Sequence, residues 1–166
     1  GSLLQMVFHA LAKNALFLCA GAVICKTGCT RVKELRGMGK RMPAVMVCFA
    51  LSSLSLVGIP PAGGFLAKWH LAVGAMRAED GVFAWLGPAV LMVSALLTAG
   101  YLFPVIVEAF FPGKDWRKTD QSEDGRLSVS AFMGVPLAVL GISLLVLGAL
   151  GNPVFELLRG IASDMV

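Results

Sequence analysis

The sequence predicts an all-α protein, a polytopic bundle of transmembrane helices. The chain is 57% hydrophobic and has a mean hydropathy of +0.81. Only 14% of its residues are charged, whereas soluble domains carry roughly a quarter. Its apolar runs are long enough for spanning helices rather than barrel strands. We therefore expect about four spans within residues 1–151, the second broken in mid-membrane, and a short interfacial helix at residues 152–166.

The first expected span runs from about Leu3 to Ile24, and a basic segment follows it. This segment, Lys26–Arg41, holds six Lys or Arg residues and one acidic residue, Glu34. Such a density of positive charge is typical of a cytoplasmic loop. Apolar spans flank the segment on both sides, which makes nucleic acid a poor candidate partner. The lipid bilayer is the partner that the sequence itself predicts.

The second expected span, from about Met42 to Met76, is too long for one straight helix. Its 35 residues would extend for roughly 52 Å, against a hydrocarbon core of roughly 30 Å. It is therefore either a hairpin of two short helices or one span broken in its middle. A single crossing places the later loop, Lys114–Arg126, with its four basic residues, on the same side as Lys26–Arg41. The positive-inside rule favours this single, broken crossing.

Two further spans and a tail complete the expected bundle. The third span is expected from about Val82 to Phe111 and the fourth from about Leu127 to Leu150. In the tail, apolar residues and interspersed charges predict a short amphipathic helix at the membrane interface. The residues that make this pattern are Val154, Phe155, Leu157, Leu158 and Ile161, with Glu156 and Arg159 between them.

Lys68 is the main candidate site residue, because an ionisable group at membrane depth is costly and is kept mainly where it functions. It follows a run of helix-breaking residues in the middle of the second span, which are Gly58, Pro60, Pro61, Gly63 and Gly64. A broken helix inside a bilayer frees backbone groups that need water or protein partners. A wetted break beside a lysine therefore predicts a proton path near the bilayer centre.

His9 and Lys13 are the next candidates, because a spacing of four places them on one face of the first helix. An imidazole beside an amine can relay protons when both are buried. Two alternatives remain: Lys13 extends to the near interface, and His9 makes a helix-packing hydrogen bond. His70 is interpreted as a packing or interfacial residue.

Further polar residues extend the candidate path. Two precede the break and four lie on the third span; they are Ser52, Ser53, Ser94, Thr98, Tyr101 and Glu108. The alternative interpretation is helix–helix contact through small hydroxyls, with Glu108 reaching the interface. Cys25 and Cys29 have no second Cys or His pair beside them, so no metal site is expected.

Three segments resemble the signatures of one family. They are His9–Leu18 followed by Ala20 and Gly21, then Gly37–Pro43, and then Gly58–Lys68. In order and spacing they are similar to the antiporter-like, proton-translocating membrane subunits of respiratory complex I. That family includes related subunits of membrane-bound hydrogenases and of multisubunit sodium/proton antiporters. The resemblance covers most of the chain.

The resemblance implies more than the residues alone. Family members have about fourteen spans built on two inverted repeats, and this chain resembles only the last few. It is therefore expected to be a C-terminal portion of such a subunit, or the product of a split or truncated gene. Lys68 matches the lysine of the family's broken helix, which exchanges protons with one side of the membrane. Lys13 and His9 match the hydrophilic axis that feeds it.

Three functions are carried forward. The first is a proton-translocating, non-redox part of an NADH-quinone oxidoreductase-like or hydrogenase-like complex. The second is a subunit of a multisubunit cation (sodium)/proton antiporter, and the third is a structural membrane module without transport of its own. The resemblance implies no cofactor in this chain, with quinone, flavin or metal clusters in partner subunits. It also implies other membrane subunits as partners and a prokaryotic cell membrane, with Lys26–Arg41 in the cytoplasm.

Overall fold

The computed structural model of the chain describes residues 2–60, 62–78, 81, 83–112, 127 and 129–150, and the single positions 153, 156 and 160. These residues form helices and connecting loops, with no strand among them. The long helices are α1 (Ser2–Thr27), α3 (Pro43–Val57), α4 (Gly63–Ala78), α5 (Phe83–Phe110) and α7 (Ala131–Ala149). The basic segment Lys26–Arg41 contains a short 3₁₀-helix, η1 (Val32–Leu35), and a short α-helix, α2 (Met38–Arg41). The predicted all-α fold is confirmed.

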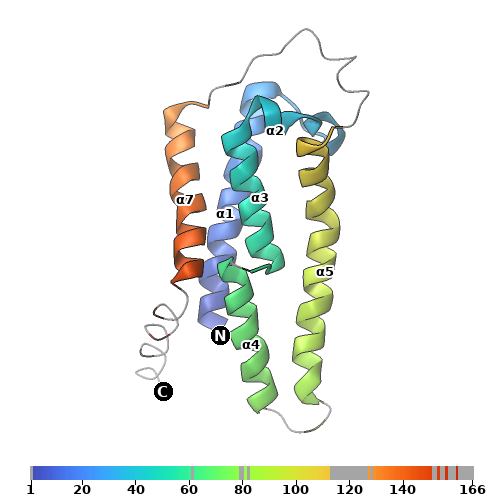
Figure 1. The fold of residues 1–166 in the computed structure, drawn as a ribbon, viewed down its shortest axis with the longest axis vertical. Helices are drawn as coiled ribbons and strands as arrows, with labels where there is room; N and C mark the ends of the chain where they lie inside the picture. The colour runs from blue at the N-terminus through green and yellow to red at the C-terminus, as the bar shows by residue number, and fades with distance from the viewer. Residues whose placement is uncertain are drawn as a thin grey trace.

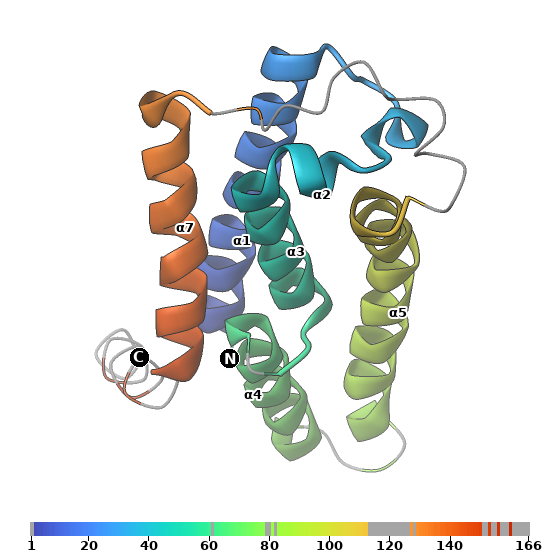
Figure 2. The same ribbon diagram turned by 45° about the horizontal axis from the view of Figure 1, so that its top comes forward.

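Helix α1 packs against three neighbours, α3, α4 and α7 (Figures 1 and 2). Its buried residues recur every three or four positions, as expected for a helix whose sides contact others. They are Leu4, Phe8, Ala12, Ala15, Cys19, Ala22 and Val23. Most of them are small, and small residues let helix backbones approach closely in membrane proteins. Helix α5 contacts α3 and α4, on the side away from α7.

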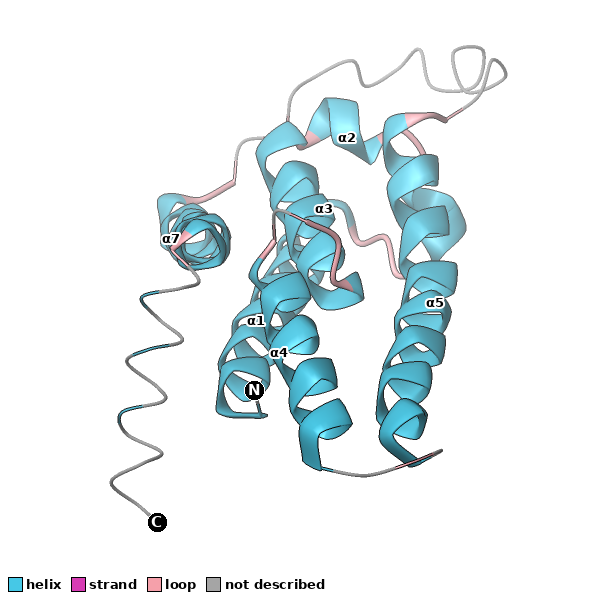
Figure 3. Cartoon of the chain, turned by 60° about the horizontal axis from the view of Figure 1, so that its bottom comes forward, coloured by secondary structure: helices cyan, strands magenta, loops and turns pink. Residues whose placement is uncertain are grey.

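Helices α3 and α4 form one broken crossing of the bundle. Their 15 and 16 residues correspond to about 22 and 24 Å, each shorter than a hydrocarbon core of roughly 30 Å. The two helices follow one another from one end of the bundle to the other (Figure 1), and Figure 3 shows the connecting loop between them. This course confirms one broken span and not a hairpin.

The basic segment lies at the end of the bundle where α1 ends and α3 begins (Figure 1). It is tied to the last turns of α5 by Glu108. The Glu108 carboxylate accepts a hydrogen bond from Arg36 Nε at 2.9 Å, and its backbone carbonyl accepts one from the Gly37 amide at 3.2 Å. Gly37 has a φ of 73°, a left-handed conformation that favours glycine. The segment is therefore a folded cap.

Three of the helices are long and apolar enough to cross a membrane, namely Ser2–Thr27, Ala84–Phe110 and Ala131–Ala149. Helix α5 exposes large apolar side chains along most of its length, including Trp85, Met92, Leu96 and Leu97. An exposed apolar surface of this size belongs in lipid or against further protein.

Two expectations need comment. The fourth span begins at Ala131 and not near Leu127, because the Ser130 carbonyl accepts the first hydrogen bonds of α7 from Met133 and Gly134. The predicted Lys114–Arg126 loop lies outside the described residues. So does the predicted interfacial helix at 152–166, apart from three single positions.

Candidate functional site

The ammonium group of Lys68 caps the C-terminal end of α3. Lys68 Nζ donates to the carbonyl of Leu56 at 2.9 Å and to that of Val57 at 2.8 Å. The last four carbonyls of a helix lack an intrahelical partner, and they form the negative end of the helix dipole. The side chain is half-buried. Since an ammonium has three donors, one remains for another partner.

The sequence of the break explains why Lys68 reaches these carbonyls. Gly58 ends α3 in a left-handed conformation, with φ 90° and its amide bonded to the Leu54 carbonyl at 2.9 Å. A left-handed glycine just after a helix is a common termination signal. A Cβ at Gly58 would lie 3.0 Å from Lys68 Cδ, so this glycine also leaves room for the lysine stem.

Two further glycines let α4 start close to its neighbours. The Gly64 amide donates to Ser55 Oγ at 3.3 Å, and a Cβ at Gly64 would collide with the Ser55 carbonyl oxygen. A Cβ at Gly63 would collide with the ring of Phe8 on α1. Any larger residue at these two positions would push α4 away from α1 and α3. Pro61, also predicted to belong to the break, lies outside the described residues.

A polar cavity of about 250 Å³ adjoins the break. Its walls come from α1, the end of α3, α4 and α5. The lining residues are Gln5, His9, Lys13, Leu56, Lys68, Ser94, Thr98 and Tyr101. The structure therefore brings the three candidate relay residues and three of the predicted hydroxyl residues of the third span to one space, although they are distant in sequence.

The polarity of this cavity is one-sided. It contains two lysines and one histidine, and no carboxylate is among its lining residues. The negative end of α3, through the Leu56 and Val57 carbonyls, partly offsets this charge at Lys68. Gln5 Oε1 is buried and has no hydrogen-bond partner among the described residues, which favours water in the cavity. Such a space can hold water between titratable groups.

Other candidates from the sequence lie elsewhere. Ser52 and Ser53 are fully buried, and neither lines the cavity. Their hydroxyl oxygens have no partner among the described residues. Glu108 is bonded to Arg36 at the end of the bundle. Gln5 was missed by the sequence analysis, although it precedes His9 by one helical turn and continues the same face.

The cysteines are separate from the cavity. Cys19 and Cys48 are buried, and their thiols donate to the carbonyls of Val45 and Leu137, each at 3.4 Å. Cys25 is exposed and Cys29 is half-buried. Among the described residues no group of three or more His, Cys, Asp or Glu side chains could hold a metal ion.

Together, the helices, the broken span and the cationic cavity define a polytopic membrane protein with a polar site at an interrupted helix. A family profile described as NADH:quinone oxidoreductase/Mrp antiporter, transmembrane, matches residues 1–107. The chain belongs to this family.

Two curated relatives and one solved structure illustrate the likeness. NADH-quinone oxidoreductase subunit N of Desulforudis audaxviator is 40% identical over 163 residues, covering 94% of this chain and 32% of the relative. A Na(+)/H(+) antiporter subunit of Alkalihalophilus pseudofirmus is 30% identical over 166 residues, covering 100% and 32%. The structure of the Mrp complex from a Dietzia species matches with a TM-score of 0.75 and 27% identity, over 90% of this chain and 34% of that chain. The chain spans about a third of the length of these relatives.

Proposed function

We propose that this chain is the proton-translocating portion of a membrane subunit in an NADH-quinone oxidoreductase-like or hydrogenase-like complex. The observation that supports it most is the shared cavity of Lys68, Lys13 and His9 beside an interrupted helix. Ionisable residues around a broken transmembrane helix are expected where ions cross the bilayer. The family assignment and the likeness to subunit N of Desulforudis audaxviator support the same class of complex.

In this proposal each basic residue has its own role. Lys68 accepts and releases the proton at the break, where the α3 carbonyls hold its amine in place. Lys13 is the relay lysine, since a proton on Lys13 repels one on Lys68 across the shared cavity. His9 extends the relay along α1, and water fills the gaps between side chains. Ser94, Thr98 and Tyr101 offer hydroxyls to that water.

Electron transfer belongs to other subunits in this proposal. Quinone, flavin or metal clusters sit in partner subunits, and this chain supplies the path for protons only. The chain acts in a prokaryotic plasma membrane, with Lys26–Arg41 on the cytoplasmic side. Because the chain covers about a third of its relatives, translocation also needs the spans that correspond to their remaining length.

The test uses the assembled complex in inverted membrane vesicles. Lys68→Ala is expected to abolish proton uptake driven by donor oxidation, while the complex stays assembled. Lys33→Ala is the matched control, because Lys33 is an exposed lysine of η1 outside the cavity, and it should pump normally. Normal pumping by an assembled Lys68→Ala complex would refute the proposal and leave the structural module as the better account.

A component of a cation/proton antiporter is the second candidate. It is supported by the likeness, over the whole chain, to the antiporter subunit of Alkalihalophilus pseudofirmus and by the Mrp complex fold. The same cavity would then exchange protons against sodium without electron transfer. An imposed sodium gradient distinguishes the two: proton movement that requires sodium and no electron donor supports the antiporter, and donor-driven movement without sodium supports the first proposal.

A further inference from the structure

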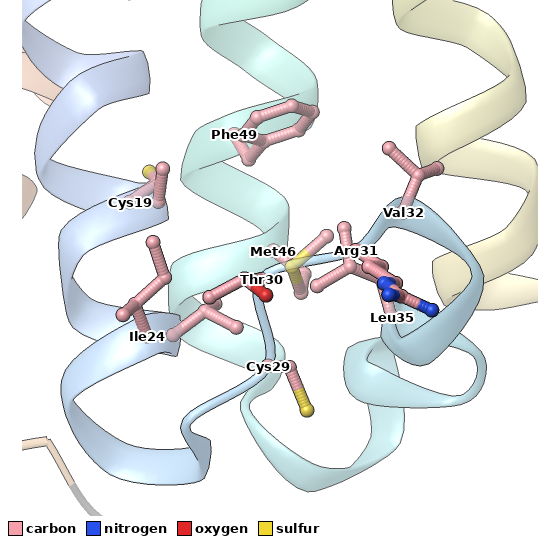
Figure 4. A pocket seen from close by; sticks show the side chains of 11 residues that line it. Cys19, Ile24, Cys29, Thr30, Arg31, Val32, Leu35, Met46 and Phe49 are labelled. Atoms are coloured by element: carbon pink, nitrogen blue, oxygen red, sulfur yellow. The ribbon is translucent and has the colours of Figure 1, made fainter.

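A second cavity, separate from the proton site, lies where α1 ends, α3 begins and the basic segment folds over them. It measures about 110 Å³ and is lined mainly by apolar side chains. Figure 4 shows the side chains around it, which include Ile24, Val32, Met46 and Phe49. It is smaller than the roughly 300–1,000 Å³ of sites for cofactors and drug-sized ligands. Its size therefore fits part of a flexible apolar chain.

A cationic side chain belongs to the wall of the same cavity. Arg31 lines it, and its side chain is drawn beside those of Met46 and Leu35 in Figure 4. The nearest acidic residue in the segment, Glu34, is already engaged, because its Oε2 accepts from the backbone amides of Thr30 at 3.0 Å and Arg31 at 3.1 Å. The Arg31 guanidinium pairs with no carboxylate among the described residues.

The surrounding charge has the same sign. Lys26 and Lys33 are exposed on either side of Arg31 in the sequence and make no ion pair within the described part of the chain. A basic segment at the end of a transmembrane helix attracts anionic lipid, at roughly 1 kcal/mol for each Lys or Arg near the surface. A guanidinium is well suited to hold a phosphate by two parallel hydrogen bonds.

We propose that this cavity binds an anionic phospholipid, with the phosphate on Arg31 and a segment of one acyl chain among Ile24, Met46 and Phe49. Charge complementarity selects the headgroup, and the apolar wall selects the chain. The rest of the lipid lies in the bilayer beside α1, where Ala20 and Ile24 are exposed at the rim. The bound lipid joins the basic segment to α1 and α3.

The experiment uses phosphatidylglycerol with a photoreactive group on its acyl chain, incorporated into membranes that contain the intact complex. After illumination, mass spectrometry maps the labelled peptides. Labelling of residues 19–35 by phosphatidylglycerol is expected to exceed labelling by phosphatidylcholine with identical chains by about tenfold, as expected for one hydrogen-bonded charge pair. Equal labelling by the two lipids would overturn the proposal.

Two pairs of variants separate the headgroup from the chain. Arg31→Gln should reduce labelling by phosphatidylglycerol to the level of phosphatidylcholine, whereas Arg77→Gln, at the last turn of α4, should not change it. Ala20→Leu fills the cavity wall and should reduce labelling by both lipids, whereas Ala10→Leu, exposed on the same helix and outside the cavity, should not. Equal effects within either pair would overturn the proposal. Displacement of the lipid by millimolar inorganic phosphate would do so too, because it would indicate a simple anion site.

Discussion

Lys68 on α4 holds the end of α3, with Nζ 2.8 Å from the carbonyl oxygen of Val57. A second bond, to Leu56, joins the same amine to the preceding carbonyl. The two halves of the broken span are therefore connected by the side chain that the sequence marks as the candidate proton carrier. Any change in the charge of Lys68 acts directly on the contact between α3 and α4.

Lys68→Met tests this contact by removing the charge while keeping a long side chain. It leaves two terminal carbonyls of α3 without their donor, and it removes a cation from the negative end of the helix. We expect the free energy of unfolding to fall by about 2 kcal/mol. The measurement is a titration with a denaturing detergent of the protein in mild-detergent micelles.

Lys33→Met is the control for this experiment, because Lys33 is exposed in η1 and contacts no helix end of the break. It should change stability by less than about 0.5 kcal/mol. Equal stability of the Lys68 and Lys33 variants would mean that the two hydrogen bonds contribute nothing to holding α3 and α4 together.

Gly64→Ala should separate α4 from α3. The added Cβ would collide with the Ser55 carbonyl oxygen, which is helix backbone and cannot rotate away. We expect a loss of about 3 kcal/mol or more, as for other substitutions that overpack a core. Gly74→Ala is the matched control on the same helix, because nothing lies within 4 Å of the position of its Cβ.

The control should leave stability unchanged or raise it by up to about 1 kcal/mol, since alanine favours helix more than glycine does. Both variants can be compared by the same detergent titration. If Gly64→Ala were as stable as Gly74→Ala, the close approach of α4 to Ser55 would not exist in the folded protein.

The side of the membrane on which the basic segment lies can be read from native cysteines. Cys25 is exposed in the last turn of α1, next to the basic segment, whereas Cys19 and Cys48 are buried. A membrane-impermeant maleimide is expected to label Cys25 in inside-out vesicles and not in right-side-out vesicles, because the segment is predicted to be cytoplasmic. Peptide mass spectrometry identifies the labelled residue.

Cys19 and Cys48 serve as internal controls, since neither should react in either type of vesicle until the protein is unfolded. Labelling of Cys25 from the outside would reverse the predicted orientation. It would also reverse the assignment of the two ends of the broken span.

The parts of this molecule that the sequence predicts are those that depend on local pattern and solvent. The spacing of His9 and Lys13, and the position of Lys68 after a glycine-proline break, predict which residues share the cavity, because helix periodicity and the cost of buried charge act residue by residue. Gln5 could have been included by the same periodicity. Long-range contacts could not be predicted in this way.

Glu108 illustrates the difference. On the sequence it continues the stripe of Ser94, Thr98 and Tyr101, yet in the fold it pairs with Arg36, which lies 72 positions earlier. That pairing depends on how the basic segment folds over the end of α5. The hydrogen bond from Gly64 to Ser55 likewise depends on how α4 turns back against α3. No spacing in the sequence indicates either contact.

Gly58 and Gly28 form a natural pair for separating backbone strain from the placement of Lys68. Each glycine follows the end of a helix with positive φ, 90° and 70°, and each donates its amide back into that helix. Alanine in this conformation costs about 1–2 kcal/mol at either position. Only at Gly58 would the added Cβ also meet a functional side chain, lying 3.0 Å from Lys68 Cδ, whereas the space around Gly28 is open.

We therefore expect Gly28→Ala to lower stability by about 1 kcal/mol and to leave proton uptake in inverted vesicles unchanged. Gly58→Ala should lower stability further and should also reduce proton uptake, because the lysine stem must move and its amine then leaves the Leu56 and Val57 carbonyls. Stability comes from detergent titration and uptake from the vesicle assay. If the two alanine variants lost stability equally and pumped equally, the contact between Gly58 and Lys68 would have no part in positioning the amine.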